Sequence, residues 1–426
     1  MQEIQLTFDK RHHQLTNAQV WTPDSQWLVF DLRPPEATFN SQTVERVNIH
    51  TGITEIIYRA TEGACVGVIT CSPQLPERYV CIHGPENPDE KWQYDLHHRR
   101  GVIIQQGQAV TLDACDITPP FTPGALRGGS HVHVYDADGD YLSFTYNDHV
   151  MHERSLAEDL RNVGVAVPLH PVNIAKQHPR EYNGSHFCVL ISTTTPEPVP
   201  GSDEISRAYE ESWVGLRGYR KQNGEWQRRA LVFIGDTVPT EGEKVPEIFI
   251  ADLPETAADY ALPGAYPLQG TAERMPSPPA GIVQRRLTFS RGIALQPRHW
   301  LRTSPDGSRI SFLMADDEGI IQLWTVSPQG GEPVQITALK HSITSVVNWH
   351  PAGDYLAFIC DNSVITCDVQ TGNCRRVTPR TDHSPDGEAV VWSPDGLSIA
   401  YSRIVGGWRQ LFIVTGELLP VSPFAG

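Results

Sequence analysis

One phrase recurs along this sequence and limits the folds open to it. It consists of apolar residues, a turn rich in Pro, Asp and Gly, and an aromatic-rich strand, and it stands at residues 20–30, 134–144, 303–313, 349–358 and 392–401, with a degenerate copy at 71–82. Proline restricts φ, aspartate bonds to the nearby backbone and glycine accepts a positive φ, so each copy predicts a tight turn between two strands. Such repetition predicts similar units packed side by side.

Residues 345–378 show what one unit contains. The segment reads as four short strands, separated by turns at 350–353, 361–362 and 371–372. A four-stranded meander of this kind cannot bury both of its faces alone, so it needs copies of itself as neighbours. A ring of such sheets, a β-propeller, meets this requirement.

A second phrase, an aliphatic residue followed by threonine, closes the units. It stands at residues 287–288, 336–337 and 377–378, and it also stands at residues 6–7, before any first strand. At the other end, strands at 398–403 and 410–414 are followed by no fourth strand. Residues 4–8 are therefore expected to complete the last sheet and to close a ring.

The predicted fold is all-β: a seven-bladed β-propeller of four-stranded blades, closed by the N-terminal strand. Six or eight blades are the alternatives, because the second and fourth units are degenerate. Residues 193–227 and 254–284 are expected to be excursions from the ring, and 151–163 a short helix that covers the ring or binds a partner. A single domain over residues 1–426 is predicted, with blades at about 17–60, 66–112, 130–176, 184–290, 299–339, 343–380 and 387–416, the last completed by 4–8.

Charge and composition restrict the partners and the compartment. Fifty acidic residues against 34 basic ones give a net charge of -16, which argues against nucleic acid or an anionic membrane as the main partner. The N-terminus does not read as a secretory signal, and no apolar run approaches the roughly 18 residues of a membrane span. The eight cysteines include no Cys-x-x-Cys pair and are expected to be thiols. These features predict a cytoplasmic protein.

Histidines fall at equivalent positions of different units. In a propeller the loops that enter the first strands gather at one mouth of the central channel, and aligning the turns places Asn17, His131, His299 and Glu388 there, with His186 added from a similar Gly-Ser-His sequence. Imidazole and carboxylate ligands suit a divalent ion such as Mn, Zn or Fe. His131, His186, His299 and Glu388 are therefore candidate metal ligands. The alternative is that these side chains cap backbone groups or line a wet channel without metal.

Other polar residues are expected near the same mouth. Asn17, Arg33, His133, Tyr146 and His149 are candidate ligand-binding residues, because cations and aromatic rings there can hold a small anionic or sugar-like ligand. Ordinary surface loops carry the same residue types, so the alternative is that these residues have no role in binding. The stretch 97–100, HHRR, is interpreted as a solvated polar segment. No phosphate-binding glycine motif is present, so no nucleotide cofactor is predicted.

The repeats resemble those of a known group. The segment 320–326, IIQLWTV, followed by GGEPVQIT at 330–337, is similar to repeats of the TolB C-terminal propeller, of oligogalacturonate lyase and of prolyl oligopeptidase propellers. Over its full length the chain looks most like the uncharacterised enterobacterial YidR family. The resemblance implies the propeller fold but no single activity.

The sequence lacks features that three of these families need for their functions. A Gly-x-Ser-x-Gly elbow, which a peptidase would need, is absent from the sequence, and neither the secretion signal nor the extra domain of TolB is expected. Oligogalacturonate lyase holds a metal through His and Gln side chains, but its ligand motif does not match, so no catalytic residue is transferred. The leading hypothesis is a propeller that binds a small anionic ligand or a protein partner at the channel mouth. The alternative is a metal-dependent lyase or hydrolase acting on a sugar acid.

Overall fold

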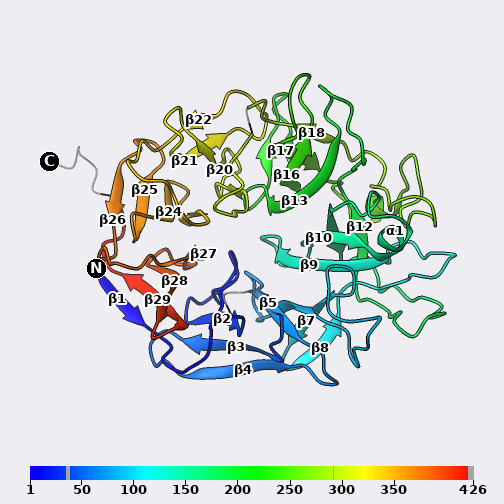
Figure 1. Ribbon diagram of the computed structural model, residues 1–426, viewed down its shortest axis with the longest axis horizontal. Coiled ribbons are helices and arrows are strands. Elements are labelled where there is room, and N and C mark those ends of the chain that lie inside the picture. The colour runs from blue at the N-terminus through cyan, green and yellow to red at the C-terminus, as the bar shows by residue number, and fades with distance from the viewer. Residues whose placement is uncertain (35–38, 291, 421–426) are drawn as a thin grey trace.

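Seven antiparallel sheets form a ring in the computed structural model, which describes all residues except 35–38, 291 and 421–426 (Figure 1). In chain order the blades are built from β2–β4, β5–β8, β9–β12, β13 with β16–β18, β19–β22, β23–β26, and β27–β29 with β1. The first blade has three strands in its sheet, and residues 14–21 take the innermost position through isolated bridges of Gln14 with Asp31 and of Trp21 with Leu28. The predicted seven-bladed propeller is confirmed.

The strands of the first three blades are β2 Trp27–Asp31, β3 Thr43–Asn48, β4 Thr54–Arg59, β5 Val66–Cys71, β6 Tyr79–His83, β7 Arg100–Gln105, β8 Gln108–Thr111, β9 Gly128–Tyr135, β10 Leu142–Asp148, β11 Asn162–Val167 and β12 Phe187–Leu190. Those of the fourth and fifth blades are β13 Ile205–Trp213, β16 Ala230–Thr237, β17 Val245–Asp252, β18 Gln284–Arg286, β19 Arg302–Thr303, β20 Ile310–Ala315, β21 Ile321–Val326 and β22 Val334–Gln335. The last two blades contain β23 Asn348–Trp349, β24 Tyr355–Cys360, β25 Ser363–Asp368, β26 Cys374–Arg376, β27 Asp386–Trp392, β28 Ser398–Val405, β29 Trp408–Thr415 and β1 Gln2–Gln5. Outside the blades lie helix α1 His149–Arg154, a short 3-10 helix Ala257–Ala261 and the hairpin of β14 Tyr219–Arg220 and β15 Trp226–Gln227.

The Pro-Asp-Gly turns owe their shape to one aspartate each. In the fifth blade, Asp306 accepts hydrogen bonds from the Ser304 hydroxyl at 2.5 Å and from the backbone N–H of Ser308 at 3.0 Å. Asp395 accepts the same pair in the seventh blade, from the Ser393 hydroxyl at 2.6 Å and from a backbone N–H at 3.0 Å. The glycine that follows has a φ of 72° in the fifth blade and 74° in the seventh. The sequence repeat is therefore a repeat of turn chemistry.

The closing threonines stabilise the outer edges of their sheets through side-chain hydrogen bonds. Each is buried beside the outermost strand, and its hydroxyl oxygen accepts a backbone N–H from the neighbouring strand of the same sheet. The four bonds are Leu411 N–H to Thr7 at 2.9 Å, Ile248 N–H to Thr288 at 3.0 Å, Leu323 N–H to Thr337 at 3.0 Å and Val364 N–H to Thr378 at 2.9 Å. The aliphatic-Thr phrase thus extends the pairing of the third strand beyond the end of the fourth.

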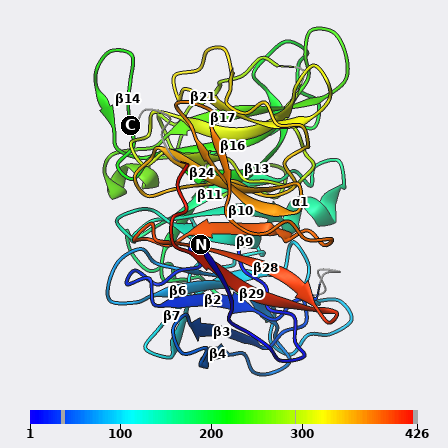
Figure 2. The same cartoon turned by 90° about the vertical axis from the view of Figure 1, so that its left-hand side faces the viewer.

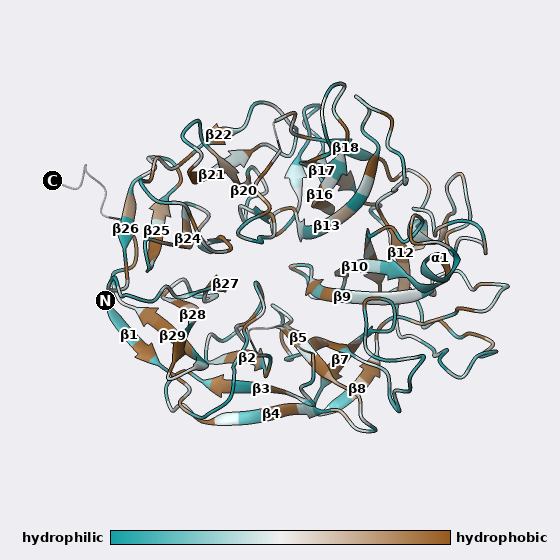
Figure 3. Cartoon of the chain, in the orientation of Figure 1, coloured by the Kyte–Doolittle hydropathy of each residue, from teal (hydrophilic) through white to brown (hydrophobic). Residues whose placement is uncertain are grey.

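The N-terminal strand closes the ring as predicted. Strand β1 pairs antiparallel with β29, with Ile4 opposite Ile413, and both views place the chain start beside the last blade (Figures 1 and 2). The Glu3 carboxylate accepts a hydrogen bond from Arg403 at 2.8 Å. Apolar residues concentrate on the strands (Figure 3), and one buried cluster joins residues of the seventh, first and second blades. All eight cysteines lie in the described residues, and each is a free thiol.

Two sequence-based boundaries are wrong around the third and fourth blades. The sequence places residues 184–190 in the fourth blade, whereas β12 pairs with β11 and is the outer strand of the third blade. The fourth blade begins instead at β13, inside the segment 193–227 that is predicted as an excursion. Strand β13 lacks the turn phrase and carries charged residues, which hides it from a repeat search. The helix predicted at 151–163 is shorter, since α1 ends at Arg154 and Val163 belongs to β11.

Candidate functional site

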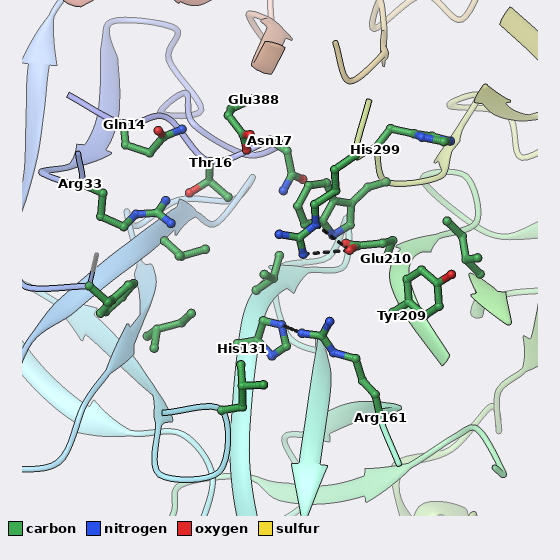
Figure 4. A pocket seen from close by; sticks show the side chains of 18 of the residues that line it. Gln14, Thr16, Asn17, Arg33, His131, Arg161, Tyr209, Glu210, His299 and Glu388 are labelled. Carbon is green, nitrogen blue, oxygen red and sulfur yellow. Dashed lines mark hydrogen bonds and ion pairs between the residues drawn. The ribbon is translucent and has the colours of Figure 1, made fainter. Parts of the chain in front are cut away.

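A cavity of about 620 Å³ opens where the chain enters the innermost strands of several blades (Figure 4). Its walls come from the first four blades and from the loop before β19, with Glu388 of the seventh blade at the edge. Its lining includes Asn17, Arg33, Phe39, Val68, Tyr94, Arg99, His131, Val132, Arg161, Arg207, Glu210, Arg298, His299 and Glu388. The size falls in the range of about 300–1,000 Å³ that is typical of small-molecule sites.

Irregular backbone marks the innermost strands at this cavity. Val68 on β5, Val132 on β9 and Glu210 on β13 have φ angles of 53°, 54° and 54°, and the pairing of all three strands with their neighbours shifts register there. A positive φ is costly for a valine because its branched Cβ crowds the backbone, at about 1–3 kcal/mol. Bulges re-aim side chains, and three blades share one at the same level, which is typical of a built site rather than of plain sheet.

The cavity carries positive charge in an acidic protein. Its described lining contains five arginines, Arg33, Arg99, Arg161, Arg207 and Arg298, against two carboxylates, those of Glu210 and Glu388. The whole chain has a net charge of -16, so this concentration of guanidinium groups runs against the overall charge. A concave site lined by one sign of charge attracts ligands of the opposite sign.

Two of these arginines, the buried Arg99 and the half-buried Arg161, are incompletely paired. Arg99 is 6% exposed and contacts the Tyr94 hydroxyl at 3.3 Å, while its Nε and one terminal nitrogen find no acceptor among the described residues. Arg161 contacts the imidazole of His131 (Figure 4), and its Nε likewise lacks a partner within the described chain. Burial, together with the repulsion of Arg99, Arg298 and Arg207, lowers the pKa of Arg161 to about 10 against the opposing effect of Glu210. An anion would supply the missing acceptors.

Two other arginines are already paired with carboxylates. Arg298 donates to Glu210 at 2.8 Å, and Arg33 donates to the buried Asp31 at 2.6 Å. These pairs fix the positions of their side chains at the rim. A flat apolar wall completes the cavity, because Phe39 and Tyr94 stack with ring centroids 4.3 Å apart. The arrangement combines anchored cations, unpaired donors and one aromatic surface.

The structure brings five of the sequence-predicted residues to this cavity, namely Asn17, Arg33, His131, His299 and Glu388. Two of them, Asn17 and His299, already use polar side-chain atoms in hydrogen bonds within the ring. The Asn17 side-chain oxygen accepts from Arg302, which lies deeper in the ring. His299 has both ring nitrogens engaged, with the Pro297 carbonyl at 3.1 Å and the Leu313 N–H at 3.2 Å.

The other four sequence-predicted residues point elsewhere. His133 is buried, with Nε2 2.9 Å from the Ser130 hydroxyl, and Tyr146 donates its hydroxyl to Asp148 at 2.8 Å within the third blade. His149 begins α1 and packs against Trp92, with ring centroids 4.8 Å apart. His186 lies beside Leu112, to which its backbone N–H donates, and not on an innermost strand. Its assignment to the mouth is wrong because residues 184–190 belong to the outer edge of the third blade.

The proposed set of four metal ligands is therefore not assembled. Both nitrogens of His299 are used and His186 is remote from the cavity, which leaves His131 and the exposed Glu388. Within the part of the chain that the structure describes, these residues form no group of three ligand atoms close enough to share an ion. The donors that face the cavity suit an anion better than a cation.

Sequence reasoning missed the residues that dominate the cavity. Arg99 lies in the stretch 97–100, whose interpretation as a solvated segment is wrong, since His97 is 7% exposed and Arg99 is 6% exposed. Arg161, Arg207 and Glu210 lie next to β11 or on β13, outside the turn phrase used for alignment. A signal did exist in this acidic chain, because arginines 99 and 161 end the connections before the third strands of the second and third blades, and arginines 207 and 298 stand near the entries of the fourth and fifth.

The charge of the cavity is expected to stay constant around neutral pH. Burial, together with Arg99 and Arg161, holds the pKa of His131 well below its usual value, and burial lowers the pKa of His299 to about 4. Both imidazoles are then neutral between pH 6 and 8. The affinity for an anion of fixed charge, such as sulfate, should therefore be the same at pH 6, 7 and 8 in calorimetric titrations. A marked rise in affinity toward pH 6 would show that an imidazole becomes charged in this range.

A second hollow, of about 580 Å³, lies at the other end of the innermost strands. It is lined by residues of the Pro-Asp-Gly turns, among them Pro23, Pro305 and Pro394, and by four tryptophans, Trp21, Trp213, Trp349 and Trp392. Arg302, bonded to Asn17 and to Asn348, lies between the two hollows. This opposite end carries the exposed Arg217 and provides a place for control substitutions.

Fold and cavity together define a seven-bladed β-propeller with a cationic pocket at one mouth of the ring. The chain is 57% identical over 414 residues to the uncharacterised protein YidR of Escherichia coli K12, a match that covers 96% of each chain. The protein belongs to the YidR family. A model of a family of unknown function, DUF3748, matches residues 65–182, a span that contains Arg99, His131 and Arg161.

Solved structures with the same fold are distant in sequence. Oligogalacturonate lyase in complex with manganese superposes with a TM-score of 0.54 at 11% identity, covering 97% of this chain and 93% of that one. The β-propeller domain of the Trilobed protease from Pyrococcus furiosus gives a TM-score of 0.51 at 9% identity, covering 96% of each chain. At these identities the likeness concerns the fold alone. No helix within residues 1–34, 39–290 and 292–420 is long and apolar enough to cross a membrane.

Proposed function

We propose that this protein binds a small anionic ligand in the arginine-lined cavity. The observation that carries the proposal is the pair of the buried Arg99 and the half-buried Arg161, each of which has a buried N–H group without an acceptor among the described residues. An unsatisfied charged donor costs free energy in the empty site, which an anion recovers on binding.

The shape of the cavity favours a carboxylated sugar over a small inorganic ion. A volume of about 620 Å³ exceeds what a sulfate or phosphate fills, and the stacked Phe39 and Tyr94 offer an apolar wall beside the arginines. Arginine matches a carboxylate through two parallel hydrogen bonds, and aromatic rings pack against the C–H faces of sugars. We therefore propose a sugar acid as the ligand class.

The second candidate is a metal-dependent lyase or hydrolase that acts on such a sugar acid. It is favoured by the shared fold with oligogalacturonate lyase, whose structure is a complex with manganese. The residues of this cavity do not fit a metal well, because His299 is fully hydrogen bonded and the arginines would repel a cation. We therefore place the binding of an anion without a metal in the arginine-lined cavity ahead of the metal-dependent enzyme.

We also propose that the protein is cytoplasmic and that neither nucleic acid nor an anionic membrane is its partner. Eight free thiols suit a reducing cytoplasm. A net charge of -16 disfavours nucleic acid and anionic membranes. A protein partner that inserts an acidic side chain would use the same arginines and is the alternative occupant.

Isothermal titration with a matched set of ligands tests the proposal. Galacturonate, digalacturonate, citrate and sulfate carry the required charge, and galactose is the neutral control of the same shape as the first. We expect the acids to bind, the affinity to fall with added salt, and galactose to give no heat. If galactose binds as tightly as galacturonate, or if none of the acids binds at millimolar concentration, the small-anion proposal is wrong.

A further inference from the structure

A second group of polar residues lies beside the cavity, between the loops of two blades. His97 belongs to the connection between β6 and β7 of the second blade, while His152 on α1 and Asp159 belong to the connection between β10 and β11 of the third. Their ligand atoms all lie within 4.8 Å of one another. In these three residues, called here the His-His-Asp group, His97 is distant in sequence from the other two and meets them only in the folded ring.

The spacing of this group suits one metal ion. The Asp159 carboxylate oxygens lie 3.0 and 3.1 Å from Nε2 of His97, and one of them lies 3.0 Å from Nδ1 of His152. Two ligand atoms bound to a tetrahedral ion at about 2.0–2.1 Å lie about 3.3 Å apart, which these separations approach. Two imidazoles and one carboxylate are also a common ligand set for zinc, with a fourth position left for water.

A second layer of residues orients His97. The Asp95 carboxylate lies 3.6 Å from Nδ1 of His97, on the side of the ring away from Asp159, and it accepts the backbone N–H of His97 at 2.6 Å. A carboxylate behind the second ring nitrogen is the usual support of a metal-bound histidine. Asp95 also lies 3.0 Å from Nδ1 of His98, whose ring stacks on Trp92 at 3.7 Å between centroids.

The His-His-Asp group is partly buried but open to an ion from one side. His97 is 7% exposed, whereas the side chains of Asp159 and His152 are 17% and 33% exposed. His97 and His98 line a separate cavity of about 600 Å³, through which an ion could enter. The backbone beside the group is closely packed, because a Cβ on Gly129 of β9 would lie 2.1 Å from the Leu96 carbonyl oxygen.

We propose that His97, His152 and Asp159 bind one divalent transition-metal ion of the zinc type. The ion joins the loop of the second blade to the loop of the third. Arg99 lies two residues after His97, and Arg161 lies two residues after Asp159, so the bound ion holds in place the two segments that carry the incompletely paired arginines of the cavity. The role of the ion is to position these two segments. This proposal does not depend on which anion the cavity binds.

Metal titrations of the full-length protein, prepared metal-free and without a polyhistidine tag, test this proposal. Competition with a zinc-binding dye should give one tight site per chain, and cobalt(II) should give the visible absorption of a tetrahedral site. Removing one ligand with H152A should weaken zinc binding by more than about 100-fold, since even supporting residues of metal sites contribute 10- to 100-fold. Bound zinc should also slow amide hydrogen exchange at residues 95–99 and 152–161.

Matched variants make the outcome decisive. H50A removes an exposed histidine from the turn after β3 and should bind zinc like the wild type. D159N keeps the shape of Asp159 and should also lose tight binding, which covers the case in which H152A folds poorly. Wild-type affinity for zinc in D159N, or zinc binding to the wild type no tighter than to H152A, would overturn the proposal. In either case the group is an ion-pair cluster between His97 and Asp159.

Discussion

Replacing Arg161 with methionine is expected to remove most of the affinity for an anionic ligand. A hydrogen bond to a charged group contributes about 1.5–3 kcal/mol, which corresponds to a change in Kd of about 10- to 150-fold. The same substitution should leave the melting temperature of the ligand-free protein unchanged or raise it. Arg161 has no hydrogen-bonded carboxylate within the described chain, and its burial together with the repulsion of Arg99 and Arg298 outweighs the attraction of Glu210. Calorimetry and thermal melts of one preparation measure both effects.

The combination of weaker binding and undiminished stability separates a binding role from a structural one. R161K keeps the charge but loses the planar fork, so its affinity should lie between those of the wild type and R161M. R217M changes an exposed arginine at the opposite end of the ring and should bind like the wild type. Loss of stability in R161M, or equal affinities of R161M and R217M, would contradict the assignment of this cavity.

The largest stability effect is expected at Asp148. This fully buried carboxylate accepts hydrogen bonds from Arg127 at 2.8 and 3.0 Å, from the Tyr146 hydroxyl at 2.8 Å, and from the Met151 N–H at the start of α1 at 2.9 Å. Changing it to alanine leaves the guanidinium of Arg127 buried without its counter-charge, which costs about 3–5 kcal/mol. For a chain of 426 residues this corresponds to about 3–6 °C in Tm.

A double variant checks the cause of that loss. In R127M/D148L both charges are replaced by apolar side chains of similar size, and removing a buried pair together is far less costly than removing one partner. Differential scanning calorimetry should therefore find the double variant more stable than D148A. If the two melt at the same temperature, the loss in D148A comes from the end of α1 rather than from the unpaired Arg127.

The ring itself was open to prediction because its signals are local. A Ser-Pro-Asp-Gly turn bonds within a few residues, as Ser304 and Asp306 do, and the closing threonines bond to a strand of the same sheet. The misassigned strands, β12 and β13, show the limit of this reasoning. They follow long connections without the turn phrase, so their partners are chosen by packing against other strands and not by their own sequence.

The cavity was predictable only in part. Aligning the turns brought His131 and Glu388 to the correct end of the ring, since the backbone of each blade has the same direction there. Strand alternation from His131 failed for His133 because the bulge at Val132 changes which side chains face the centre, and Tyr146 lies within β10 rather than in the connection that follows it. It also overlooked Arg99 and Arg161, whose long side chains enter the cavity from connections rather than from the aligned strands.

The turns and the strands of most sheets follow from the chain alone, because neighbours a few residues apart determine them. The aliphatic-Thr phrase at residues 6–7 likewise marks the first strand as the missing partner of the last sheet. The electrostatic character of the mouth and the meeting of His97 with His152 and Asp159 required the folded ring. Loops from different blades meet there at distances that no repeat specifies, and burial then decides which charges keep a partner. That is why an acidic chain can hold a cationic pocket that its composition does not reveal.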